Sequence, residues 1–314
     1  MKKILFIIFT VTGINFGIRA QDFHFTQWDR LKLYYSPAET GNDEYKYSAQ
    51  MMMRSQWRYF LSRPFATYFV SYDMPLKERW GVGGYLAKNE AAWGYNDYRV
   101  VASGSYLITN PGQKKHLLKT GLQAGFIHKN LSSLSTFDKQ YQDGGFNSEL
   151  PSGENIGSLT RWMPEFNWGI YYAFLSEDNK WNPSVSFAVN HITAPNEAMI
   201  GSPSNLPRRF TTTISIPYVI DERNTVQAGV LGMWQGKHQE IMPGIMYQYK
   251  LNDPEIKLTG NAMYRINDSF IAGVGLIYKE FIYMFTYDVN VSPLKSYSRN
   301  RGALEFSITF KRKK

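Results

Sequence analysis

Apolar and polar residues alternate along most of this chain, and the pattern is clearest near the C-terminus. From Gly302 to Phe310 every second residue is apolar, and the residues between them are mostly polar. The apolar set is Leu304, Phe306, Ile308 and Phe310. Because successive side chains of a β-strand point to opposite faces, this segment is predicted to be a strand with one apolar face. Its backbone N–H and C=O groups need a neighbouring strand to pair with. The segment would therefore be either an edge strand of a sandwich or the closing strand of a barrel.

The same alternation recurs in about fourteen segments. They are 45–57, 66–74, 80–86, 98–108, 118–126, 166–174, 185–189, 210–218, 226–234, 241–249, 256–264, 270–278, 281–289 and 302–310. Turns containing Asp, Asn, Pro or Gly join many of them, whereas three longer connections, 129–163, 193–207 and 292–301, are irregular and polar. All three follow odd-numbered strands, so an up-and-down barrel would carry them at one end.

Composition favours a membrane barrel over a soluble β-sandwich. Aromatic residues make up 16% of the chain, yet the mean hydropathy is −0.37. This combination is typical of outer-membrane barrels, in which only every second strand residue faces lipid. A sandwich also buries alternate residues, but Tyr and Trp at strand ends favour membrane girdles. We therefore expect an all-β transmembrane antiparallel up-and-down β-barrel over residues 45–310, with short periplasmic turns, longer extracellular loops and a basic periplasmic tail at 311–314.

The first twenty residues are predicted to be a secretory signal peptide. Lys2 and Lys3 precede an apolar segment from Ile4 to Val11, and Ala20 supplies the small residue of a cleavage site. The apolar segment is too short for a transmembrane helix, which needs about 20 apolar residues. Residues 21–44 are then expected to be an ordered periplasmic lead-in, or a plug-like piece at the barrel mouth. The absence of cysteine from an exported chain indicates a bacterial envelope protein.

The formal charge of +9 falls to +6 once Lys2, Lys3 and Arg19 are removed with the signal peptide. The remaining basic residues are scattered, and no basic run occurs before the final tail. Nucleic acid is therefore not expected as a partner. Attraction to anionic outer-membrane lipid is the better explanation of the excess positive charge.

No catalytic, cofactor-binding or metal-binding residues are predicted, and no cofactor is expected. The chain has no Gly-x-Ser-x-Gly, no His-Glu-x-x-His and no Walker A motif. His128 and His191 are predicted near the outer strand ends, where a hydrolase could place catalytic histidines, although interfacial polar residues are the simpler interpretation. The segment from Asp138 to Gly145 resembles a calcium loop only faintly, because its glycine comes one position late.

Five charged residues on predicted strands fall on the inward face and could pair across the lumen. They are Arg54, Lys257, Arg265, Asp288 and Glu305. Buried charges need partners, so a structural network is one interpretation, and a polar path for a solute is the other.

Several short motifs, in their order and spacing, resemble the PorP/SprF family of outer-membrane proteins of the type IX secretion and gliding machinery. The motifs are Gln21 to Gln27, Ser36 to Gly41, Arg54 to Trp57, Ser71 to Asp73, Gly81 to Gly83, Tyr287-Asp288, Ser292, Leu294, Gly302 and Glu305. The family pattern has Asn where this chain has Ser36, and a polar residue where it has Leu304. The resemblance spans Gln21 to Phe310.

The resemblance implies a non-enzymatic outer-membrane barrel that assists the export, or the cell-surface attachment, of a large type IX-secreted adhesin. Its partners would be that adhesin and secretion-machinery proteins. The long polar loop and its base would supply the contacts, and the residues expected there are Phe137, Tyr141, Phe146, Arg161 and Trp162. A porin or transporter for a small solute is the alternative function.

In a barrel the last strand would pair with the first, Tyr45 to Trp57, because an open edge in lipid leaves backbone groups unpaired. Leu304, Phe306, Ile308 and Phe310 would then form the outer face of the barrel seam.

Overall fold

The computed structural model describes residues 22–42, 45–56, 65–91, 94–112, 115–131, 140–142, 145–147, 149–150, 160–178, 180–199, 201–293 and 299–313. The proposed signal peptide lies outside these residues. Two short helices come first, α1 (Lys32–Tyr35) and the 3-10 helix η1 (Pro37–Glu39). The strands that follow are β1 (Tyr47–Gln56), β2 (Phe65–Leu76), β3 (Trp80–Ala91), β4 (Tyr95–Leu107), β5 (His116–Leu131), β6 (Tyr141–Gln142), β7 (Gly145–Phe146), β8 (Thr160–Phe174), β9 (Ser184–Asn190), β10 (Arg209–Val219), β11 (Asn224–Gln235), β12 (His238–Lys250), β13 (Ile256–Arg265), β14 (Ser269–Tyr278), β15 (Phe281–Asn290) and β16 (Arg301–Arg312).

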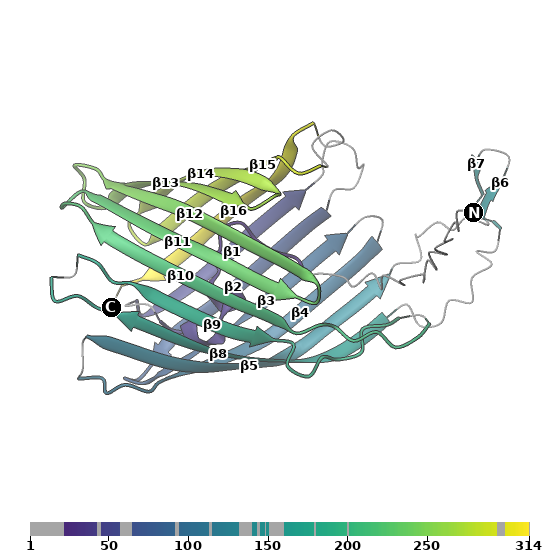
Figure 1. Cartoon of the computed structure of the whole chain (residues 1–314), viewed down its shortest axis with the longest axis horizontal. Coiled ribbons are helices and arrows are strands. Elements are labelled where there is room, and N and C mark those ends of the chain that lie inside the picture. Colours follow the sequence, from purple (N-terminus) through teal and green to yellow (C-terminus); the bar gives the residue numbers. More distant parts are fainter. Residues whose placement is uncertain are drawn as a thin grey trace, which may run out of the picture.

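Fourteen of the described strands form one closed antiparallel barrel, so the predicted fold class is confirmed (Figure 1). Each strand pairs with its neighbours in sequence order, and β5 pairs with β8 because β6 and β7 form a separate hairpin in the connection between them. The closing pair is β1 with β16, in which Met51 lies opposite Ile308 and Arg54 opposite Glu305. Thr160 to Met163 belong to β8, so the irregular segment is shorter than the predicted 129–163.

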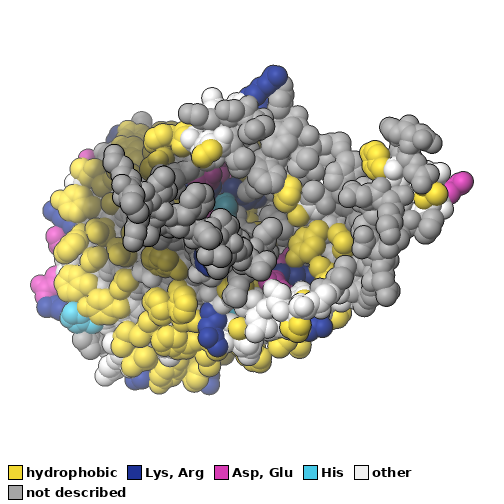
Figure 2. All heavy atoms as spheres, turned by 45° about the vertical axis from the view of Figure 1, so that its right-hand side comes forward, with side chains coloured by type: hydrophobic (Ala, Val, Ile, Leu, Met, Phe, Trp, Pro, Cys, Tyr) yellow, Lys and Arg dark blue, Asp and Glu magenta, His cyan; other side chains and the backbone are white. Residues whose placement is uncertain are grey.

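Side chains alternate between the lumen and the outer wall along every barrel strand. On β16, Ala303, Glu305, Ser307 and Thr309 are buried, whereas Phe306 is 38% exposed. Figure 2 shows hydrophobic side chains gathered over the outer wall, as lipid contact requires. Among the described residues no helix is long and apolar enough to cross a membrane.

The two ends of the barrel differ in the length of their connections. The connections 132–159, 191–208 and 291–300 lie at one end, which we call the loop end. The opposite end, which we call the turn end, carries short turns such as 77–79 and 279–280. β1 begins at the turn end, because it is the first strand of the up-and-down series.

Residues 22–42 run through the interior of the barrel from the loop end to the turn end, and we call them the plug (Figure 1). Phe25 and Tyr34 of the plug pack against Phe69 and Tyr85 of the wall, so the apolar core of the protein lies inside the lumen. The wall makes room for the backbone of the plug: a Cβ on Gly121 would lie 2.3 Å from the carbonyl oxygen of Pro37. The lead-in expected at 21–44 therefore lies within the barrel over its described residues.

Candidate functional site: the filled lumen

The first feature of the lumen is a carboxylate that holds the plug by its backbone. Glu305 on β16 accepts hydrogen bonds from the backbone N–H groups of Thr26 and Gln27, at 2.6 and 3.0 Å. It also pairs with Arg54 on β1, at 2.5 Å, directly across the strand pair that closes the barrel. Glu305 and Arg54 are 0% and 3% exposed as side chains. The same ion pair therefore joins the two strands that close the barrel and lies next to the docked plug.

Asp288 and Arg265 complete what we call the Glu305 cluster, formed by Thr26, Arg54, Arg265, Asp288 and Glu305. Asp288 accepts from the Thr26 hydroxyl at 3.0 Å and pairs with both arginines at 3.2 Å. Four of the five charged residues predicted to face the lumen thus meet at one place. Lys257 is not among them, because it lies at the other end of the barrel, at the start of β13.

A second cluster fixes the first residue of the plug at the loop end. Asp22 pairs with Arg99 at 2.7 Å, with His191 at 2.6 Å and with Arg209 at 2.8 Å. These three residues come from β4, from the residue after β9 and from the start of β10. We call these four residues the Asp22 cluster. It joins distant parts of the wall through one carboxylate of the plug.

His191 lies immediately beyond β9 and is fully buried. Burial disfavours its charged form, but the carboxylates of Asp22 and Glu165 outweigh this effect and raise the pKa of His191. Glu165 contacts Nδ1 at 2.7 Å, and Asp22 contacts Nε2 at 2.6 Å. A protonated ring can donate to both carboxylates, which fits its position between them.

The connection between β9 and β10 covers part of the loop end. Leu206 packs against Ile127 of β5 and Met163 of β8 in a small buried cluster. Glu197 pairs with Lys129 at 2.6 Å, and Arg161 donates to the carbonyl oxygen of Asn196 at 2.9 Å. This connection and the plug together occupy the loop half of the lumen.

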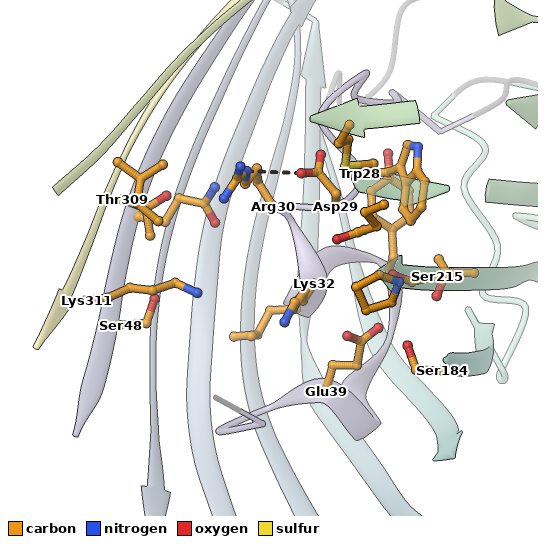
Figure 3. Close-up of a pocket in the computed structure, with 18 of the residues that line it drawn as sticks. Trp28, Asp29, Arg30, Lys32, Glu39, Ser48, Ser184, Ser215, Thr309 and Lys311 are labelled. Atoms are coloured by element: carbon orange, nitrogen blue, oxygen red, sulfur yellow. Dashed lines mark ion pairs between the residues drawn. The ribbon is translucent and has the colours of Figure 1, made fainter. Parts of the chain in front are cut away.

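The turn half of the lumen holds a cavity of about 360 Å³. Its floor is the plug, from Trp28 to Leu33, and Figure 3 shows Lys32 between the wall residues Ser48 and Ser184. Hydroxyl and amide side chains dominate the wall. They are Ser48, Gln50, Ser71, Asn182, Ser184, Thr213, Ser215, Thr225, Gln227, Gln248, Thr259 and Thr309. This lining suits a polar occupant.

Three of the residues predicted to bind a partner have described side chains: Tyr141, Arg161 and Trp162. Phe137 and the side chain of Phe146 lie outside the described part of the structure. Tyr141 is on β6 and 61% exposed. Trp162 is 67% exposed on the outer wall and stacks on His128 with ring centroids 4.2 Å apart. Arg161, its neighbour, instead faces the β9–β10 connection.

The residues predicted for the seam lie on one face of β16. Leu304, Phe306, Ile308 and Phe310 are opposite Ser55, Met53, Met51 and Ala49 of β1. Phe310 also contacts Tyr47 and Phe281, with ring centroids 5.9 and 5.0 Å apart. The polar face of the same strand holds the plug, through Glu305 and through Ser307, which donates to Gln27.

The two histidines considered for a hydrolase lie on opposite sides of the wall. His128 stacks between Tyr98 and Trp162 on the outside. His191 is enclosed in the lumen. They cannot share one active site. Among the described residues no group of three or more His, Asp and Glu side chains is placed to hold a metal ion.

Sequence reasoning missed the Asp22 cluster. Arg99 lies on the same face of β4 as Asp97, with which it pairs at 3.0 Å, and Asp22 follows the expected cleavage site by two residues. An inward charge on a barrel strand indicates a partner in the lumen. The period-two pattern does not say which residue that partner is, because Asp22 and Arg99 are far apart in sequence.

Comparison with known proteins agrees with this architecture. A family model described as type IX secretion system membrane protein PorP/SprF matches residues 18–310. None of the curated proteins compared with the chain matches it. In structure the chain is similar to the toluene transporter TbuX of Ralstonia pickettii, with 11% identity, 90% of this chain and 92% of that chain covered and a TM-score of 0.52. It is also similar to the toluene transporter TodX of Pseudomonas putida, with 8% identity, 93% and 95% covered and a TM-score of 0.53. At these identities the two likenesses show the fold alone.

Proposed function

This chain belongs to the PorP/SprF family of type IX secretion system membrane proteins, and we propose that it is a non-enzymatic outer-membrane partner of a type IX-secreted adhesin. It would assist export of the adhesin or hold it at the cell surface. The loop end would face the outside, because outer-membrane barrels carry their longer loops there and their short turns in the periplasm.

The filled lumen is the observation that supports this proposal most. Two buried ionic clusters fix the plug to strands on several sides of the barrel. An open diffusion pore requires a continuous aqueous path, whereas the loop half of this lumen is packed with the plug and the β9–β10 connection. A barrel filled in this way suits attachment through its external surface better than diffusion through its centre.

The loop between β5 and β8 is the first surface to test. Deletion of residues 135–155 should leave the barrel inserted in the outer membrane but release the adhesin from cells into the medium. Adhesin on washed cells is compared with adhesin in the medium by immunoblotting, and insertion is followed by heat-modifiable migration on gels. Unchanged retention of the adhesin would show that the loop plays no part.

Two exposed aromatic residues provide a matched pair for the same assay. Tyr141→Ala changes a residue of the loop, whereas Trp162→Ala changes one on the outer wall at the base of that loop. We expect strong loss of retention with Tyr141→Ala and a smaller loss with Trp162→Ala, because Trp162 lies at the edge of the predicted contact. A loss confined to Trp162→Ala would place the contact at the outer wall instead.

Solute transport is the alternative function, and the cavity at the turn end is the observation in its favour. Purified protein in planar bilayers distinguishes the two. A barrel closed by its plug should show no steady conductance, and steady ohmic channels in the wild-type protein would favour the porin.

A further inference from the structure

Three lysines gather at the turn end of the barrel, and we call them the lysine rim: Lys250, Lys257 and Lys313. Lys250 ends β12, Lys257 lies at the start of β13, and Lys313 follows β16. Lys250 and Lys257 fall on the inward register of their strands, since Gln248 and Thr259 on the same faces line the cavity. The rim therefore faces the mouth of the lumen.

The rim concentrates charge of one sign. Lys250 and Lys257 lie directly opposite each other across the β12–β13 pair. The charges that act on Lys257 come from Lys250 and Lys313, and both are positive. Like charges directly opposite on paired strands destabilise a sheet. The barrel thus maintains a repulsive arrangement that its fold does not require.

Nearby acidic residues bind partners other than the side chains of the lysine rim. In the turn between β12 and β13, Asp253 accepts the backbone N–H of Glu255, and Glu255 pairs with Lys279. Glu280 pairs with Arg312 and accepts the backbone N–H of Lys313 at 3.2 Å, so it binds the main chain of the rim but not its ammonium groups. Within the described part of the chain, no carboxylate lies within ion-pair distance of the side chains of the lysine rim. The ammonium groups of the rim are therefore available to an acidic ligand.

The cavity behind the rim is balanced in charge. Its lining contains three basic and three acidic side chains, and the rest of its polar surface is hydroxyl and amide. The basic residues are Arg30, Lys32 and Lys311, and the acidic residues are Asp29, Glu39 and Asp73. A ligand that fits the whole mouth would therefore carry acidic groups at the rim and neutral hydrogen-bonding groups deeper inside.

We propose that the turn-end mouth binds an acidic peptide segment of a periplasmic partner. Side-chain carboxylates would neutralise the lysine rim, and the peptide backbone would bind the hydroxyl and amide groups of the cavity through its N–H and C=O groups. An anionic lipid fits less well, because lipid headgroups border the outer wall, whereas Lys250 and Lys257 face the lumen. This inference does not depend on how the loop end holds an adhesin.

The test uses the full-length mature protein in nanodiscs and two fluorescent probes. One probe is a short peptide of alternating Glu and Ser, and the other is the same peptide with Gln in place of Glu. Fluorescence anisotropy should show binding of the acidic peptide alone, weakening as salt rises from about 50 to about 300 mM. The triple variant Lys250→Gln, Lys257→Gln, Lys313→Gln should weaken that binding by about tenfold.

A second triple variant provides the control, because it removes the same charge from the same end of the barrel. Lys77→Gln, Lys115→Gln and Lys180→Gln change exposed turn lysines outside the rim and the cavity lining. Binding within about twofold of wild type is expected for this variant. Equal losses in both triple variants, or equal binding of the two peptides, would overturn the proposal. So would a rim variant that binds the acidic peptide normally but loses binding to phosphatidylglycerol vesicles, because the rim would then be a lipid site.

Discussion

The two halves of the lumen differ in the pairing of their charged side chains. In the loop half, Arg54 and Arg265 each contact carboxylates, and Glu305 also binds two backbone N–H groups of the plug. In the turn half, Lys250 lies opposite Lys257, and the cavity beside them is empty of protein atoms. The loop half is therefore a completed interface between plug and wall. The turn half combines like charges with an open polar cavity, and the proposal that it binds an acidic peptide is based on that combination.

In the loop half, substitution of Glu305 is expected to lower the free energy of unfolding most. Glu305→Ala leaves Arg54 without its closest carboxylate and removes the acceptor of the Thr26 and Gln27 N–H groups. Breaking one partner of a buried ion pair costs about 3–5 kcal/mol. We expect the free energy of unfolding to fall by that amount, measured by urea denaturation in lipid vesicles with tryptophan fluorescence.

Glu280→Ala serves as the matched control, because Glu280 pairs with Arg312 in a half-exposed position at the turn end. Its loss should cost less than about 1 kcal/mol. Similar values for the two variants would show that the plug does not depend on Glu305.

The last strand, the lumen charges and the plug show how much of the structure could be predicted from the sequence. The regular alternation from Leu304 to Phe310 predicts the two faces of that strand, and recurrence of the pattern predicts the strand count. Barrel closure needs two further arguments, the composition and the cost of an open edge in lipid. The inward charges of Arg54, Arg265, Asp288 and Glu305 indicate a lumen network. Alternation cannot place residues 22–42, because the plug has neither a strand nor a helix period and its contacts are non-local. Its position depends on pairs such as Asp22 with Arg99, which only the folded barrel brings together.

Asp22 supplies the second largest expected effect in the loop half. Asp22→Asn retains the shape of the side chain but removes the charge that Arg99, Arg209 and His191 share. Arg99 keeps Asp97 and His191 keeps Glu165, but Arg209 loses its ion-pair partner. A buried group left without its partner costs about 1–3 kcal/mol, so the free energy of unfolding should fall by roughly that amount. The Asn variant of exposed Asp221 is the control and should unfold like wild type.

The same variant should change the pH dependence of stability. Burial disfavours the charged form of His191, but the carboxylates of Asp22 and Glu165 outweigh this effect and raise its pKa in the folded barrel. Its contribution is complete below the unfolded pKa of about 6.5 and is lost as pH rises through the raised folded value. Wild type should therefore lose stability above about pH 6.5, and Asp22→Asn should lose less. Parallel pH profiles would contradict the role of this pair.

Phe310 provides a test of the outer face of β16, with its neighbour Thr309 on the lumen face as the comparison. Phe310→Asp places a charge on the outer face, against Tyr47 and Phe281. Near a membrane interface such a change costs about 0–1 kcal/mol in the folded barrel, but we expect less protein in the outer membrane, because a terminal aromatic residue resembles the assembly signal of barrels. Outer-membrane fractionation measures this, with Thr309→Asp on the lumen side as the comparison. Normal insertion of Phe310→Asp would contradict a role of Phe310 in barrel assembly.

The smallest expected effect has the opposite sign and lies in the turn half. Lys257→Gln removes one of two like charges that face each other across β12 and β13. Relief of this repulsion should raise the free energy of unfolding by roughly 0.2–1 kcal/mol, whereas Lys279→Gln, which breaks the ion pair with Glu255, should leave it unchanged or lower it slightly. The gain should shrink at high salt, because the repulsion is screened. If Lys257→Gln both stabilises the barrel and weakens binding of an acidic peptide, then Lys257 contributes to binding and lowers stability. A destabilised Lys257→Gln barrel would instead mean that the rim has a structural partner, and the contrast between the two halves would then be lost.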